Sequence, residues 1–204
     1  MFDSGISVKS LIEELKNTEV DIALEIPDKT YAEWLNSLLQ LLYTEVIKEQ
    51  KEKVFYPPFA NNLIELSTMA ESGENTPRFE DIHAVYADDK QLMKSTVTSG
   101  VIFHDTFYKN NNNLGYNTKT TPAIIKIIYY VKPELITTTS HGNVNDTNVM
   151  VPVEFIDLVK AKLRGEAYKL ANEDSIAAKW LNDYNILLET FKAWIAEKSP
   201  NFGM

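Results

Sequence analysis

Three histidines and several adjacent carboxylates are the residues of this chain whose types could perform acid–base or metal chemistry. His104 stands directly before Asp105, and a base oriented by a carboxylate is a common catalytic pairing. Neighbouring residues on a strand point to opposite faces, so we expect His104 to be a solvated histidine at a strand end. His83 falls in a predicted strand and His141 in a polar loop, and neither has the one-turn spacing of two metal-binding histidines. The sequence therefore predicts no catalytic residue and no metal ligand.

Paired acids and one polar cluster are interpreted as solvated surface residues. These groups are Glu13-Glu14, Glu80-Asp81, Asp88-Asp89 and the cluster of Asn143, Asn145 and Asp146. A two-carboxylate active site needs a fixed separation across a cleft, which adjacency does not provide. The polar cluster lacks the glycine and final glutamate of a calcium-binding loop. The seven glycines are dispersed and match no phosphate-binding or nucleophile-elbow pattern, so no cofactor is predicted.

Composition describes a chain that can fold without covalent cross-links. Its 204 residues, 44% of them apolar, suffice for one sizeable core, and the absence of cysteine removes disulfides, thiolate zinc sites and cysteine nucleophiles. Met1 through Ile6 lacks a basic region followed by an apolar run, and no window approaches the roughly 18–20 apolar residues of a membrane span. We expect a soluble, unexported protein with no membrane partner.

Charge argues against tight binding to nucleic acid. The net charge of −9 divides into about −5 over residues 1–56, −3 over 57–151 and −1 over 152–204. A protein that grips DNA concentrates lysine and arginine on one face, and no part of this sequence is basic. An acidic surface lining a conduit would instead let DNA slide past. If a hidden basic surface existed, the first residues to neutralise would be Lys160, Lys162, Arg164 and Lys169.

Two predicted helical arms bracket the chain, at about 7–52 and 152–198. Ser10 and Glu13 have capping-box spacing in a short helix over about 7–17. Pro27 and Asp28 open a longer helix over about 28–52, which a charged turn ends before Pro57. One C-terminal helix begins at Pro152 and a second at Ser175, and the short turn between them predicts an antiparallel hairpin.

The middle, about 55–150, is predicted to be a small antiparallel sheet inserted in a helical bundle. Its candidate strands are 63–66, 82–86, 92–93, 100–103, 106–108, 114–117 and 124–131, and 137–148 is predicted to be a mobile loop. The predicted fold is therefore one α+β domain, 1–204, that is mainly a helical bundle with a small antiparallel β insertion. In its core, we expect Trp180, Leu181, Tyr184, Leu188 and Phe191 to pack against Tyr31, Leu35, Leu38 and Leu42.

Aromatic side chains are interpreted as packing groups. Trp34, Trp180 and Trp194 fall on apolar helix stripes, which favours core positions over a ligand box. Tyr108, Tyr116, Tyr129 and Tyr130 lie in predicted strands without accompanying basic residues, so packing or a protein interface is favoured over base stacking.

Four stretches carry a family resemblance across nearly the whole chain. They are Ile26-Pro27-Asp28 leading into the helix at 31–36, the predicted hairpin 82–90, the strand 127–133 ending in Lys132-Pro133, and the closing helices from Pro152 and Ser175. Their order resembles the head-to-tail adaptor proteins of tailed bacteriophages, which include the tail-tubular A and portal-adaptor proteins of short-tailed phages. The segment 55–79 is longer than this pattern expects.

The resemblance implies a virion structural protein without catalysis or cofactor. Such a protein forms a ring with copies of itself beneath the portal protein, extends the DNA conduit, and receives the downstream tail or nozzle protein. It would be made in the host bacterial cytoplasm and reside in the neck or tail of the virion. In this hypothesis the C-terminal tail contacts the portal, through Ser199, Pro200, Asn201, Phe202, Gly203 and Met204. The alternatives are a cytosolic protein-binding module and a hydrolase that uses His104 and Asp105.

Overall fold

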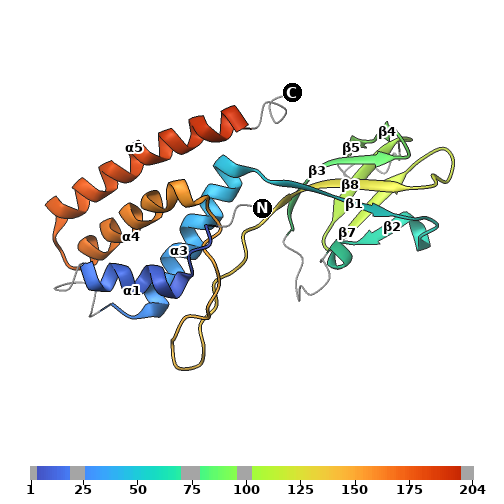
Figure 1. Ribbon diagram of the computed structural model, residues 1–204. Helices are drawn as coiled ribbons and strands as arrows, with labels where there is room; N and C mark the ends of the chain where they lie inside the picture. Colours follow the sequence, from blue (N-terminus) through green and yellow to red (C-terminus); the bar gives the residue numbers. More distant parts are fainter. Residues whose placement is uncertain (1–3, 19–25, 70–78, 96–102, 199–204) are drawn as a thin grey trace. The chain divides into compact units, whose positions relative to one another are not determined.

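The computed structural model describes residues 4–18, 26–69, 79–95 and 103–198 (Figure 1). Backbone contacts divide the chain into two compact units. The helical unit comprises Met1–Ile47 and Pro133–Met204, and the β unit comprises Lys48–Lys132. Each unit has a hydrophobic cluster made of its own residues. By sequence the helical unit carries the entire net charge of −9, since acids and bases balance within the β unit.

Four helices form the helical unit. They are α1 (Val8–Thr18), α3 (Asp28–Leu42), α4 (Ile156–Leu170) and α5 (Asp174–Lys198), with a π-helical turn η1 (Tyr43–Ile47) after α3 and a 3-10 turn η4 (Val153–Phe155) before α4. Pro27 fixes an extended backbone just before α3, and Asp28 places a carboxylate in its first turn. α1 begins differently from its prediction, because the Ser7 hydroxyl, and not Ser10, accepts the capping hydrogen bond, from Ser10 N.

α4 is the central helix of this unit. It packs against α1, α3 and α5, and its buried residues lie on more than one side of the helix. They are Ile156, Leu158, Val159, Ala161, Leu163, Gly165 and Ala167. These buried residues form more than one stripe, whereas Leu170 and Ala171 at the end of the helix are exposed. A helix surrounded on several sides shows weak amphipathicity in its sequence.

α5 packs chiefly along α4 (Figure 1), so α3 is not its main partner. Tyr184 and Phe191 are buried as predicted, whereas Trp180, Leu181 and Leu188 are only half-buried. Tyr184 and Phe191 belong to the same hydrophobic cluster as Tyr31, Leu35, Leu38 and Leu42, but the main neighbour of α5 is α4. One flank of α5 consequently remains open to solvent.

A glycine sets the close approach of α4 to α5. Gly165 is buried, and a Cβ atom there would lie 2.7 Å from both Cγ and Cδ2 of Leu181. We expect Gly165→Val to lower the free energy of unfolding by about 1–3 kcal/mol, because overpacking forces the helices apart. Chemical denaturation measures this, and Leu181→Ala in the same background should recover part of the loss. Wild-type stability of Gly165→Val would contradict the close approach.

The segment before α4 is anchored to the rest of the helical unit. Asn36 on α3 exchanges two hydrogen bonds of 2.9 Å with the backbone of Ile136. Val8 N donates to Thr147 O, and Val149 N donates to Ile6 O. Between these anchors, Asn145 N donates a hydrogen bond to Thr137 O. The segment 137–148, predicted to be a mobile loop, is therefore a hydrogen-bonded loop with an exposed tip.

The β unit consists of two four-stranded sheets. The first has the order β1 (Gln50–Phe55), β8 (Ile125–Val131), β3 (Phe79–Ala87), β4 (Lys90–Gln91) and is antiparallel. The second has the order β2 (Leu63–Glu65), β7 (Asn113–Asn117), β6 (Thr106–Asn110), β5 (Met93–Lys94), with β5 parallel to β6. Two 3-10 turns, η2 (Ala60–Asn62) and η3 (Leu66–Met69), flank β2.

Both sheets contribute to one hydrophobic core. β8 alternates buried and half-buried residues along its whole length, and Ile125 and Ile127 are fully buried. They belong to the same cluster as Leu114 and Tyr116 of β7 and Phe107 of β6. This period of two is what one buried sheet face requires.

The predicted fold class, a helical bundle with a small β insertion, is wrong. The structure is α+β with 48% helix and 24% strand in two four-stranded sheets. The β unit spans Lys48–Lys132, whereas the sequence placed the insertion at about 55–150. The long N-terminal helix was predicted to reach residue 52, but α3 ends at Leu42 and η1 at Ile47. The expected charged turn at 48–53 lies largely in strand β1.

Candidate protein-interaction surface

The exposed flank of α5 borders a groove beside α4. The groove has a volume of about 460 Å³ and is lined by Asp157, Ala161 and Arg164 of α4 and by Trp180, Asp183, Ile186 and Leu187 of α5. Ile186 is 59% exposed, and Trp180 and Leu187 are half-buried. The groove therefore places three apolar side chains, one of them largely exposed, beside a concave surface.

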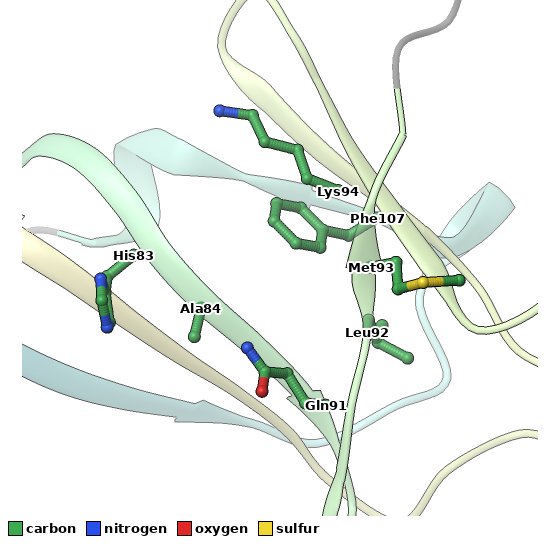
Figure 2. Close-up of a pocket in the computed structure, with 7 residues that line it drawn as sticks. All are labelled: His83, Ala84, Gln91, Leu92, Met93, Lys94 and Phe107. Atoms are coloured by element: carbon green, nitrogen blue, oxygen red, sulfur yellow. The ribbon is translucent and has the colours of Figure 1, made fainter. Parts of the chain in front are cut away.

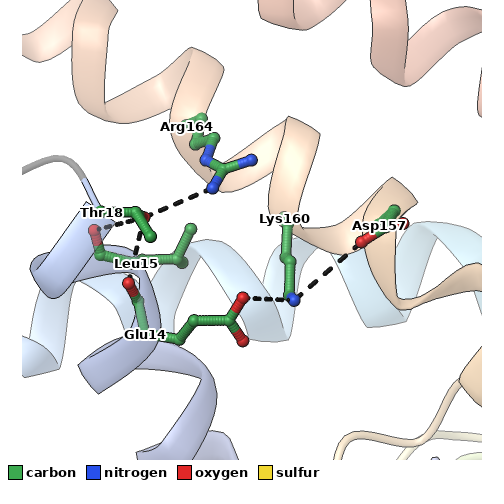
Figure 3. A network of polar contacts seen from close by, with 6 residues as sticks. All are labelled: Glu14, Leu15, Thr18, Asp157, Lys160 and Arg164. Carbon is green, nitrogen blue, oxygen red and sulfur yellow. Dashed lines mark hydrogen bonds and ion pairs between the residues drawn. The ribbon is translucent and has the colours of Figure 1, made fainter.

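Arg164 is held by contacts within the helical unit. Its guanidinium carbon lies 4.6 Å from the centroid of the Trp180 ring, within cation–π range. Its Nη2 also donates to the Thr18 hydroxyl of α1, at 3.3 Å (Figure 3). The positive charge is therefore already engaged with groups of this chain.

Lys160, one turn earlier on α4, is likewise engaged. Its ammonium donates to Glu14 Oε1 of α1 at 2.6 Å and lies 4.0 Å from Asp157 Oδ1 (Figure 3). Because Glu14 holds this cation more closely, Asp157 keeps a highly exposed carboxylate at the groove. Asp183 supplies a second carboxylate from α5. The groove thus combines an apolar floor with two acids.

Tyr184, on the buried side of α5, provides a pH-dependent prediction. Burial, and secondarily the charge of Glu45, raise the pKa of its hydroxyl above 10. A group whose pKa is raised on folding contributes stability that is present below its unfolded pKa and lost as pH rises through the folded value. We therefore expect stability to fall above pH 10, and Tyr184→Phe to reduce that fall. Denaturation midpoints across pH 8–11 measure the effect, and equal slopes for both proteins would contradict it.

A second concave region lies in the β unit, where the edges of its two sheets meet. It has a volume of about 440 Å³ and is lined by His83, Ala84, Gln91, Leu92, Met93, Lys94 and Phe107 (Figure 2). His83 does not face a carboxylate there, because its Nδ1 shares a 2.9 Å hydrogen bond with the Tyr130 hydroxyl. The rings of His83 and Tyr130 also meet edge to face. Among the described residues that line this region, none is a carboxylate that could pair with His83.

No protein-family description matches this chain, and no curated protein does either.

The remaining sequence candidates are not among the residues that line the groove. Asp105 pairs with Lys90 at 2.6 Å, and this hydrogen bond holds the pKa of its carboxyl below the ordinary value. His104 is exposed at the start of β6, and His141 is exposed at the tip of the 137–148 segment. Lys90, and not His104, is therefore the hydrogen-bonding partner of this aspartate.

Each acidic pair contains at least one carboxylate with a partner among the described residues. Glu14 binds Lys160, as described above, and Glu13 lies 4.0 Å from Lys9. Asp88 accepts hydrogen bonds from Ala123 N and Ile124 N in the turn between β3 and β4. Asp81 accepts from Ile82 N on β3. Within the residues that the structure describes, no three His, Asp or Glu side chains gather to hold a metal ion.

Two further sequence expectations concern the tail and the membrane. The candidate contact residues Ser199–Met204 lie outside the described residues. In the described ranges, 4–18, 26–69, 79–95 and 103–198, no helix is both long and apolar enough to cross a bilayer.

Sequence reasoning missed the groove, although one signal was present. Apolar residues of α5 spread wider than the face that α4 buries, and Ile186 is not among the α5 residues predicted to lie in the core. An apolar residue on the far side of an otherwise amphipathic helix is the pattern that a second binding face produces.

Proposed function

We propose that this chain is a virion structural protein, a head-to-tail adaptor that forms a ring beneath the portal protein in the neck of a tailed bacteriophage. In this role it extends the DNA conduit and receives the downstream tail or nozzle protein. The observation that supports the proposal is the groove along α5, because its exposed apolar side chains lie beside a concave surface that another protein could cover. No enzymatic activity is part of the proposal.

The order of elements also supports it. The stretch at Ile26 leads directly into α3, residues 82–90 include the hairpin of β3 and β4, and 127–133 include most of β8. α4 and α5 form the closing helical hairpin. These are the elements on which the resemblance to adaptor proteins rests.

The pairing of the basic residues of α4 predicts weak binding to DNA. Lys160 and Lys162 are paired with Glu14 and Glu166 at 2.6 and 2.7 Å, and Arg164 lies over Trp180. Free duplex should therefore bind negligibly, even at low salt where attraction is greatest. Titration of labelled duplex tests this, and micromolar binding that weakens steeply with added salt would contradict a conduit that does not grip DNA.

Ring formation separates the adaptor from its alternatives. A cytosolic protein-binding module would also use an apolar groove but would bind as a monomer or dimer. The hydrolase alternative is less well supported, because the carboxylate of Asp105 is engaged by Lys90.

Electron microscopy of the full chain mixed with the portal protein of its own genome provides the test. We expect rings of this chain seated on portal rings, with the portal acting as template. Complete absence of binding to the portal at micromolar concentrations would contradict the adaptor role.

A further inference from the structure

We infer that the groove between α4 and α5 receives a segment of a partner protein in which an aliphatic side chain is flanked by lysine or arginine. This inference rests on the proposal that the chain docks to another protein. It adds the chemistry of the partner and the residues that select it. The three residues with distinct roles are Ile186, Asp157 and Asp183.

The floor of the groove selects an aliphatic group. Ala161 leaves space on α4, while Leu187 and the Trp180 ring form apolar walls from α5. The Arg164 guanidinium carbon lies 4.6 Å from the centroid of the Trp180 ring, and this contact orients the ring before a partner binds. Ile186 extends the apolar surface outward and is 59% exposed. An inserted aliphatic side chain would cover these atoms at little conformational cost, because the walls are already ordered.

The charges of the groove select basic neighbours. Lys160 pairs more closely with Glu14 than with Asp157, since Glu14 lies nearer to its ammonium group. Asp183 lies on the opposite helix, so the two carboxylates flank the apolar floor from both sides. Two cations lie over the Trp180 ring, Arg164 at 4.6 Å and Lys179 at 5.9 Å, and Arg164 also donates to Thr18. An acidic segment would meet like charge there, whereas lysine or arginine would form new ion pairs.

The same argument disfavours a second copy of the helical unit as the occupant. That unit carries the whole net charge of −9 by sequence, so a second helical unit would bring like net charge to this groove, and the ring contacts of the proposed adaptor would lie on other surfaces. A basic partner is attracted by the same field.

The first experiment selects ligands without assuming a partner. A displayed library of random peptides of about 12 residues is panned against the full chain. We expect enriched peptides with an aliphatic residue between lysines or arginines. Synthetic versions should lose affinity about tenfold or more with Ile186→Ser and with Asp183→Lys, because truncating a central anchor of an interface has an effect of this size.

Two matched variants control for general effects. Leu170 is as exposed as Ile186, 58% against 59%, but does not line the groove, so Leu170→Ser should leave peptide affinity unchanged. Glu197, exposed in the last turn of α5, serves likewise, and Glu197→Lys matches the charge change of Asp183→Lys. Circular dichroism of each variant confirms the wild-type helix content.

Several outcomes overturn the inference. These are failure to enrich any peptide, enrichment of acidic peptides, and equal loss of affinity in groove and control variants. Self-association of the wild type that Ile186→Ser abolishes, with no peptide enriched, would assign the groove to a second copy instead.

A second experiment separates this inference from the adaptor role. Affinity for the portal protein of the same genome is measured by interferometry with the same four variants. Portal binding that all four variants retain would keep the adaptor role and reject the groove as its docking site. Selective peptides combined with no portal binding would keep the groove and reject the adaptor role.

Discussion

Replacing Phe191 by alanine is expected to lower the free energy of unfolding by about 3–5 kcal/mol. Phe191 is fully buried, and its ring lies 4.7 Å from that of Phe155 and 6.2 Å from that of Trp194. Phe155 and Trp194 also contact each other, at 5.4 Å, so three rings pack together where α5 meets the start of α4. Removing the central ring leaves a cavity that the ordered helices cannot close.

The control is Leu188→Ala on the same helix. Leu188 is half-buried, so its truncation should have a clearly smaller effect than that of Phe191. Urea denaturation followed by far-ultraviolet circular dichroism gives both values. Equal losses for the two variants would show that the face of α5 assigned to the core is wrong.

The pattern of α5 shows how much of the fold could be predicted from sequence. The apolar spacing identified Tyr184 and Phe191 correctly as buried residues. The spacing did not identify α4 as the main neighbour of α5, because an apolar stripe on one helix shows which face is buried but not which element covers that face. α4 contacts α1, α3 and α5, and this central position depends on the arrangement of several elements, which the sequence of one helix does not specify.

Strand β1 shows why the boundary between the units was not predicted. Lys51, Glu52 and Lys53 were interpreted as a charged helix end, since charges are common there. In the structure they lie on the edge strand of a sheet, paired with Tyr129, Ile128 and Ile127 of β8. Charged residues on an edge strand disfavour pairing with a strand of another chain. The sequence alone does not show that β1 is an edge strand, so this role of the charged residues was not predicted.

The candidate site was predictable only in part. Sequence reasoning interpreted the paired acids and His104 as solvated surface residues, whereas Glu14 forms an ion pair with Lys160 and Asp105 forms one with Lys90. The groove joins residues of α4 and α5 that have no shared motif, so its members could be recognised only from their positions in space.

Ile127→Asp is expected to unfold the β unit. Ile127 is fully buried on the central region of β8 and belongs to the core that both sheets share. A carboxylate there would lose its hydration without gaining a partner, a change that costs about 4–5 kcal/mol or more. Heteronuclear NMR should show the dispersed strand resonances collapsing.

Ile128→Asp provides the matched comparison, since it places the same charge one residue further along the same strand. Ile128 is half-buried on the other face of the sheet, where an aspartate keeps contact with water, so the β unit should remain folded. The helical signal at 222 nm should survive in both variants, because the cluster formed by α1, α3, α4 and α5 contains no residue of Lys48–Lys132. Loss of the helical signal together with the strands in Ile127→Asp would show that the two units fold as one cooperative structure.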